Sequence, residues 1–125
     1  MTRFYELTLR PQSALPLRRE SVRQQLLSAG LRTPLDNPAT GLLADDFALF
    51  EIIANPAMPA GVWVLVRIPL GRTFLELTTE LLNLERLALI LQADVIDGDE
   101  IMVHSGHAGL AALFAFHARY ERAAL

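Results

Sequence analysis

Carboxylate and imidazole side chains gather in the last third of the chain, and they are the residues best suited to metal or acid–base chemistry. The run consists of Asp94, Asp97, Asp99, Glu100, His104 and His107. Such groups bind divalent cations, but the spacing does not match an EF-hand loop, and a His-x-x-His pair needs further ligands to hold zinc. The weak metal candidates are Asp97, Asp99, His104 and His107. We expect the run to be an acidic hairpin turn that leads into a helix.

No nucleophile or phosphate-binding motif accompanies this run. Ser105 and His107 are sequence neighbours and do not form a triad. The glycine pair at 106 and 109 lacks the lysine and spacing of a P-loop, and no Gly-x-Ser-x-Gly motif is present. The chain has no cysteine, which excludes thiolate ligands and cysteine nucleophiles. His117 falls on an apolar helical stripe and is typical of a core histidine. We therefore expect no catalytic residue and no cofactor, and predict that the chain is not an enzyme.

The composition predicts a single folded domain over residues 1–125. Of the 125 residues 52% are hydrophobic and 20% charged, which is enough for a core without disulfides. The net charge of −3 argues against nucleic acid as a partner. All 11 basic residues are arginine, and they are scattered along the chain. The sequence shows no signal-peptide pattern and no apolar run of membrane-spanning length, so we expect no membrane insertion and a cytoplasmic location.

The elements that must position these residues follow from periodicity and turn signals. Residues 4–10 alternate with a period of two, as in a strand. Leu77, Leu81 and Leu84 repeat at helical spacing, after a capping-box pair formed by Thr73 and Glu76. Strands are predicted at 4–10, 46–54, 62–69 and 94–96, a returning strand at 100–103, and helices at 17–29, 74–92 and 106–123. The order β-α-β-β-α-β(β)-α predicts an α+β fold, a two-layer split βαβ sandwich of the ferredoxin-like kind.

One face of the predicted sheet is unusually apolar. In the strand at 62–69 the valines and Ile68 alternate with Trp63, Leu65 and Arg67. The β-branched set suits the side packed on helices, so the other set should face outward. The outward patch would consist of Phe4, Phe47, Leu49, Ile53, Trp63 and Leu65, with Arg67 beside it. The last helix could cover this patch, a second copy could bind it in a homodimer, or a different partner could bind it.

The order of these features resembles the C-terminal domain of ZipA, the bacterial cell-division protein. The segments that carry the resemblance are VRQQLLSAGL at 22–31, FALFEI at 47–52, PAGVWVL at 59–65, IPLG at 68–71 and ADVID at 93–97. The resemblance implies a sheet backed by helices on one side. It also implies that the open apolar face binds a short peptide, which in that family is the C-terminal tail of FtsZ. The matching outward residues would be Phe47, Leu49, Trp63 and Leu65.

Three functions remain open on the sequence alone. The first is a non-catalytic protein-binding module that uses the apolar sheet face, with the FtsZ tail as a candidate partner. The second is an immunity protein or antitoxin that neutralises a bacterial toxin, partly through the acidic edge around residues 94–100. The third is a small ligand- or metal-binding enzyme built on the aspartate and histidine run.

Overall fold

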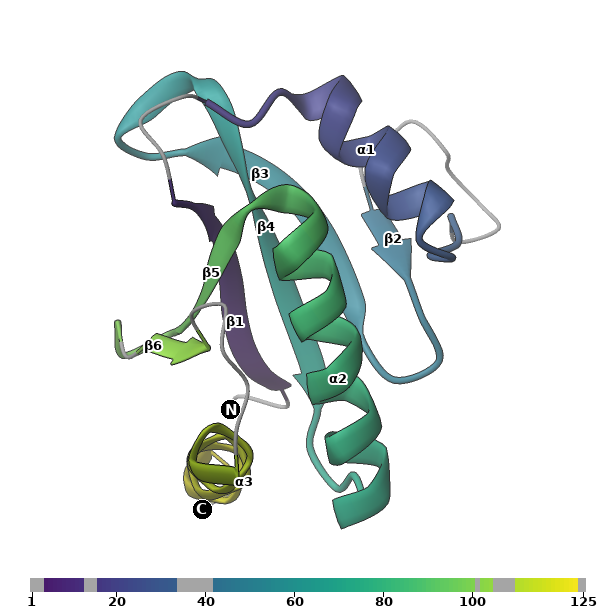
Figure 1. Ribbon diagram of the computed structural model, residues 1–125, viewed down its shortest axis with the longest axis vertical. Helices are drawn as coiled ribbons and strands as arrows, with labels where there is room; N and C mark the ends of the chain where they lie inside the picture. The colour runs from purple at the N-terminus through teal and green to yellow at the C-terminus, as the bar shows by residue number, and fades with distance from the viewer. Residues whose placement is uncertain (1–3, 13–15, 34–41, 101, 105–109, 124–125) are drawn as a thin grey trace.

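A six-stranded antiparallel sheet with three helices organises the chain (Figure 1). The computed structural model describes residues 4–12, 16–33, 42–100, 102–104 and 110–123. The strands are β1 (Phe4–Pro11), β2 (Leu42–Ala44), β3 (Leu49–Asn55), β4 (Met58–Pro69), β5 (Ala93–Asp97) and β6 (Met102–His104). The helices are α1 (Arg19–Ser28), α2 (Phe74–Leu91) and α3 (Leu110–Ala123).

The strand order identifies the split βαβ arrangement that the sequence predicted. The order across the sheet is β2-β3-β4-β1-β5-β6, so β4 lies between β1 and β3, the two longer strands that α1 and the short strand β2 separate in the chain. Every neighbouring pair is antiparallel. The α+β sandwich is therefore confirmed, with short strands β2 and β6 added at the edges.

All three helices pack on the same face of the sheet, and the core lies between the two layers. In Figure 1 α1 and α2 lie in front of the strands, and α3 is seen end-on beside the end of β1. The inward side chains of β1, Tyr5, Leu7 and Leu9, are at most 5% exposed. The rings of Phe116 and Tyr120 on α3 each lie 6.0 Å from the Tyr5 ring in edge-on contacts. The idea that the last helix covers the opposite face is therefore wrong for the described part of α3.

A local signal fixes the start of α2 as expected from the sequence. The Thr73 hydroxyl accepts a hydrogen bond from the Glu76 backbone N–H, and the Glu76 carboxylate accepts one from the Thr73 N–H. These two bonds satisfy amide groups that have no partner inside the helix. Among the described helices none is long and apolar enough to cross a membrane.

Several predicted boundaries were wrong because side chains reshape the turns. Asp45 accepts hydrogen bonds from the N–H groups of Phe47 and Ala48, so β3 begins at Leu49 and not at residue 46. The Asn55 side chain accepts from the Ala57 N–H, which closes a tight turn and lets β4 begin at Met58 instead of 62. Helix α1 begins at Arg19, not at residue 17. Strand β2 was not expected at all.

Candidate functional site

The side of the sheet away from the helices is an open face, and no described helix packs on it (Figure 1). Along β1, β3, β4 and β5 buried side chains alternate with partly exposed ones, and the partly exposed ones form this face. Its apolar members are Phe4, Leu49, Ile53, Trp63, Leu65 and Ile96. Alternation of this kind is typical of a sheet with one face on the core and one toward solvent.

Strand register brings the central residues of this face side by side. Trp63 on β4 lies opposite Ile53 on β3. Leu65 lies between Thr8 on β1 and Glu51 on β3. These directly opposed positions are the closest side-chain neighbours in an antiparallel sheet. Three strands therefore contribute to one surface with Trp63 and Leu65 at its middle.

Arg10 holds the indole of Trp63 in place. Its guanidinium carbon lies 4.1 Å from the centre of the ring, within the range of a cation–π contact. The same guanidinium donates two hydrogen bonds to the Glu100 carboxylate, at 2.5 and 2.9 Å, and one to the Thr8 hydroxyl at 2.8 Å. The bonds from Arg10 keep the pKa of Glu100 below its usual value. The Trp63 ring is thus packed against a guanidinium that is itself held by Glu100 and Thr8.

A second arginine crosses three strands on the same face. Arg67 lies 3.3 Å from the Glu6 carboxylate on β1 and 3.1 Å from the Glu51 carboxylate on β3. Each of the three side chains is about one-third exposed or more, so these ion pairs add little stability. They place a polar cluster of one arginine and two glutamates next to the apolar row of Ile53, Trp63 and Leu65. The face therefore carries both apolar side chains and paired polar groups.

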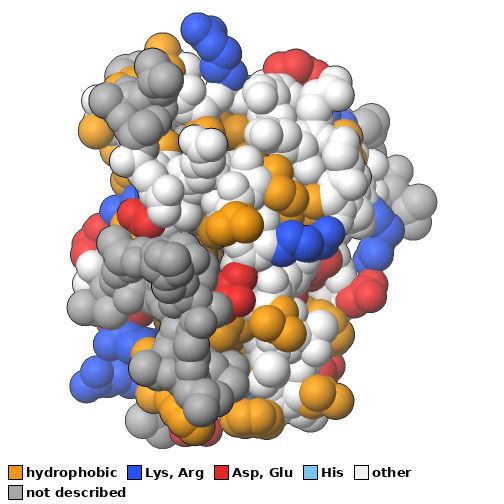
Figure 2. Space-filling model, viewed as in Figure 1, with side chains coloured by type: hydrophobic (Ala, Val, Ile, Leu, Met, Phe, Trp, Pro, Cys, Tyr) orange, Lys and Arg blue, Asp and Glu red, His pale blue; other side chains and the backbone are white. Residues whose placement is uncertain are grey.

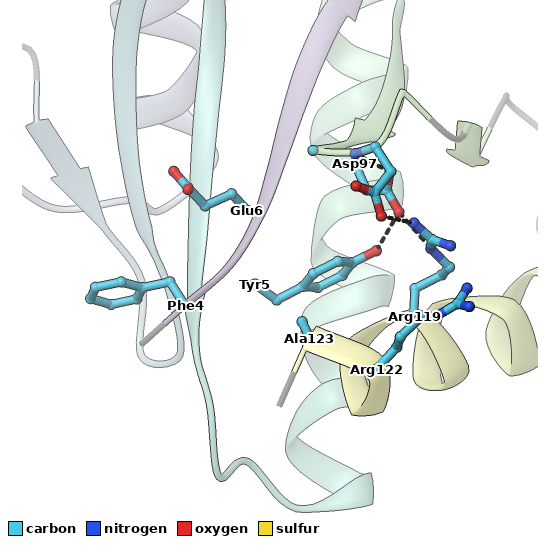
Figure 3. A pocket seen from close by; sticks show the side chains of 9 residues that line it. Phe4, Tyr5, Glu6, Asp97, Arg119, Arg122 and Ala123 are labelled. Carbon is cyan, nitrogen blue, oxygen red and sulfur yellow. Dashed lines mark hydrogen bonds and ion pairs between the residues drawn. The ribbon is translucent and has the colours of Figure 1, made fainter. Parts of the chain in front are cut away.

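A hollow of about 330 Å³ lies at the end of β1, beside the open face (Figure 3). Tyr5 points into it toward Asp97 and Arg119, while Phe4 and Glu6 point to the other side of the strand. Asp97 is 1% exposed and accepts hydrogen bonds from Arg119 Nε at 2.7 Å and from the Tyr5 hydroxyl at 3.2 Å. Burial, and then the charge of Asp97, raises the pKa of the Tyr5 hydroxyl. These groups satisfy one another and tie α3 to the sheet.

The acidic run that the sequence singled out is used largely for internal pairing. Asp99 lies 2.5 Å from Arg119, and Asp94 accepts a hydrogen bond from Gln12 at 2.9 Å. Asp97 is buried rather than at the surface of the hairpin turn, because Arg119 arrives from α3 to pair with it. His104 lies on β6, and His107 lies outside the described residues. Within the described ranges no group of three or more His, Cys, Asp or Glu is placed to hold a metal ion.

Phe47 is set apart from the other residues of the expected patch. It lies in the turn before β3, and its ring is 5.9 Å from the guanidinium of Arg72, which precedes α2. Arg72 also donates to the Phe47 carbonyl at 3.4 Å.

His117 is the buried helix residue that its apolar stripe predicted. It is 8% exposed and stacks on Phe74 with the ring centres 4.1 Å apart.

Two members of the open face were missed by sequence reasoning. Arg10 and Ile96 lie on it, and both alternate in register with the outward residues of their strands. The period of two along residues 93–97 could have identified Ile96. The stacking of Arg10 on Trp63 depends on which strand lies beside β4, which the alternation does not show.

Comparison with known proteins adds no relative to this description. No protein-family model matches the chain, and no curated protein or solved structure matches it either.

Proposed function

We propose that this chain is a non-catalytic protein-binding module that holds a segment of a partner protein on the open face of its sheet. The observation that supports the proposal best is the position of Trp63 and Leu65. Both lie at the middle of a partly exposed face formed by three strands, and all described helices lie on the other side. Partly exposed apolar residues gathered in one place are a common mark of an interaction site.

The chemistry of the face favours a protein segment as the occupant. Tryptophan and arginine are the residues that most often dominate binding energy at protein interfaces. Trp63 and Arg67 lie on the same strand, with Leu65 between them. Both are already held by neighbours, Trp63 by Arg10 and Arg67 by two glutamates. Less side-chain entropy is therefore lost when a partner binds.

The two candidate partners differ in the part of the surface that each would contact. A peptide such as the FtsZ tail, implied by the resemblance to ZipA, would use the apolar row. A toxin would also have to use the acidic edge. Asp97 and Asp99 share Arg119, and Glu100 is paired with Arg10, so internal ion pairs already use part of the acidic edge. The apolar row has no such internal use, and this difference favours the peptide-binding alternative.

Leu65→Asp is expected to abolish partner binding while the fold survives. A carboxylate at the centre of a buried contact would lack a compensating charge, and we expect affinity to fall by at least about 100-fold. The measurement is capture of partners from host lysate by immobilised wild type and Leu65→Asp, followed by titration with the purified partner. Circular dichroism and thermal melting establish that the variant is folded.

Leu27→Asp is the matched control, because Leu27 is 39% exposed on α1 in the helix layer. It introduces the same charge on the other side of the molecule and should bind like wild type. A folded Leu65→Asp variant that keeps the wild-type affinity would contradict the proposal. Equal loss in both variants would also contradict it, because the effect would then not belong to the sheet face.

A further inference from the structure

The outer side of the helix layer carries a stripe of exposed leucines along α2. Leu75, Leu82 and Leu89 are 74%, 61% and 68% exposed. They are spaced by seven residues, which is close to two helical turns, so they lie almost on one line along the helix. Figure 2, which views the molecule from the helix side, shows separate hydrophobic patches there with charged side chains between them. We call this set the leucine stripe.

The leucine stripe is not part of the core. The core face of α2 is formed by other residues, among them Leu77, Leu84 and Leu87, which are at most 3% exposed. A helix that is apolar on both sides is normally buried on both sides. Nothing among the described residues covers the outer side of α2, so one of its two apolar faces has no partner within this part of the chain.

The neighbouring helices flank the stripe and leave it accessible. On one side Arg86 donates a hydrogen bond to the Ala29 carbonyl at the end of α1, at 2.8 Å. On the other side the Thr78 hydroxyl lies 3.2 Å from a ring nitrogen of His117 on α3. Helices α1 and α3 therefore contact opposite flanks of α2, and the leucine stripe runs between them.

We propose that the leucine stripe is a dimer interface, at which α2 packs against α2 of a second copy of this chain. Leu82 is the middle of three equally spaced leucines. A two-fold pairing that covers all three leucines of each stripe therefore places Leu82 against Leu82 of the second copy. A self-complementary patch of this kind is what a two-fold dimer requires.

The charges beside the stripe are compatible with this pairing. Glu85 and Thr78 are seven residues apart and share one flank, and Arg86 and Thr79 share the other. In an antiparallel pair each charged residue faces a threonine of the second copy. In a parallel pair Glu85 faces Arg86 of the second copy. No like charges oppose one another in either arrangement, which would otherwise weaken the contact.

The inference is independent of the proposed function, but the two are structurally compatible. Because the helices lie on one side of the sheet, pairing through α2 leaves both open sheet faces directed away from the interface. Such a dimer would present two binding faces at once. Two linked faces can bind a repeated or clustered partner more tightly than one.

The test is the oligomeric state of the full chain in solution. Three leucines per copy make a small interface, so we expect a dimer with a dissociation constant on the order of micromolar, seen by sedimentation equilibrium up to about 500 µM. Leu82→Glu should raise that constant at least about 100-fold, because it sets two carboxylates against each other at the two-fold axis. Leu27→Glu is the control and should leave the constant unchanged.

A cross-linking experiment checks the same interface without a charge. The chain has no cysteine, so Leu82→Cys introduces a single thiol. Facing helices bring directly opposed Cα atoms within about 6 Å, which a disulfide can span. Mild oxidation should therefore yield a covalent dimer of Leu82→Cys and not of Leu27→Cys.

Three results would overturn the inference. The first is a wild-type chain that stays monomeric over the whole concentration range. The second is a dimer that persists unchanged in folded Leu82→Glu. The third is a dimer that Leu65→Asp breaks and Leu82→Glu does not, which would place the contact on the sheet face instead.

Discussion

Arg119→Met is expected to lower the free energy of unfolding by about 3 kcal/mol, because it removes the charged partner of a buried carboxylate. Asp97 is 1% exposed, and Arg119 Nε lies 2.7 Å from its side-chain oxygen. The Tyr5 hydroxyl and the Asp99 backbone N–H also donate to Asp97, at 3.2 and 2.9 Å, but neither carries a charge. Urea denaturation of the variant and of wild type at neutral pH measures the difference.

Two further variants separate this charge effect from the loss of packing. Arg122→Met changes an exposed arginine on the same helix and should cost less than about 0.5 kcal/mol. In the double variant Asp97→Asn, Arg119→Met no charge is left buried, so much of the lost stability should return. If Arg119→Met costs no more than Arg122→Met, the ion pair with Asp97 does not stabilise the fold as expected.

Glu80→Gln is expected to stabilise the protein at pH 7 by about 3 kcal/mol and to flatten its stability between pH 5 and 9. Glu80 is 1% exposed, and its two carboxyl oxygens have no hydrogen-bond partner among the described residues. Burial, helped by the charge of Asp45 and opposed by that of Arg72, raises the pKa of Glu80 to about 9. The folded protein therefore holds this proton at pH 7, whereas the unfolded chain does not.

The sign of the pH dependence follows from that difference. A carboxyl group whose pKa is raised by folding gives its full stability below the unfolded pKa, and loses it as the pH rises toward the folded pKa. Wild type should therefore lose about 1.4 kcal/mol per pH unit between roughly pH 5 and 9 relative to Glu80→Gln. Urea denaturation across this range, with Glu121→Gln as the exposed control, measures the slope. If the free energies of unfolding of wild type and Glu80→Gln ran parallel across this pH range, Glu80 would not be protonated in the folded protein.

Most of the fold could be predicted from the alternation of residue types along the chain. The period of two in β1 and β4 predicted both strands and which of their side chains face away from the helices. The Thr73 and Glu76 pair predicted where α2 begins. Strand β2 was missed because three residues are too few to show a period, and it depends on pairing with β3 and on the backbone bonds between Arg32 and Ala44.

The site was less predictable, because it depends on contacts between distant segments. Asp97 looked like the exposed start of a turn, and only the approach of Arg119 from α3 shows that it is buried. Glu80 had a signal that was missed: it lies three residues after Leu77 and four before Leu84, on the buried side of α2. The leucine stripe also had a signal in the sequence, because residues spaced by seven on a helix lie almost on one line.

Quenching of Trp63 fluorescence shows whether a partner binds on the open face of the sheet. Trp63 is the only tryptophan of the chain and lies at the middle of the open face. The tryptophan emission is recorded at increasing acrylamide concentration, once for the free chain and once for its complex with the partner that wild type captured. The partner is supplied as a peptide that contains no tryptophan. A partner on the open face should shield the indole and lower the quenching constant. Unchanged quenching in the saturated complex would place the partner elsewhere and contradict binding on the open face.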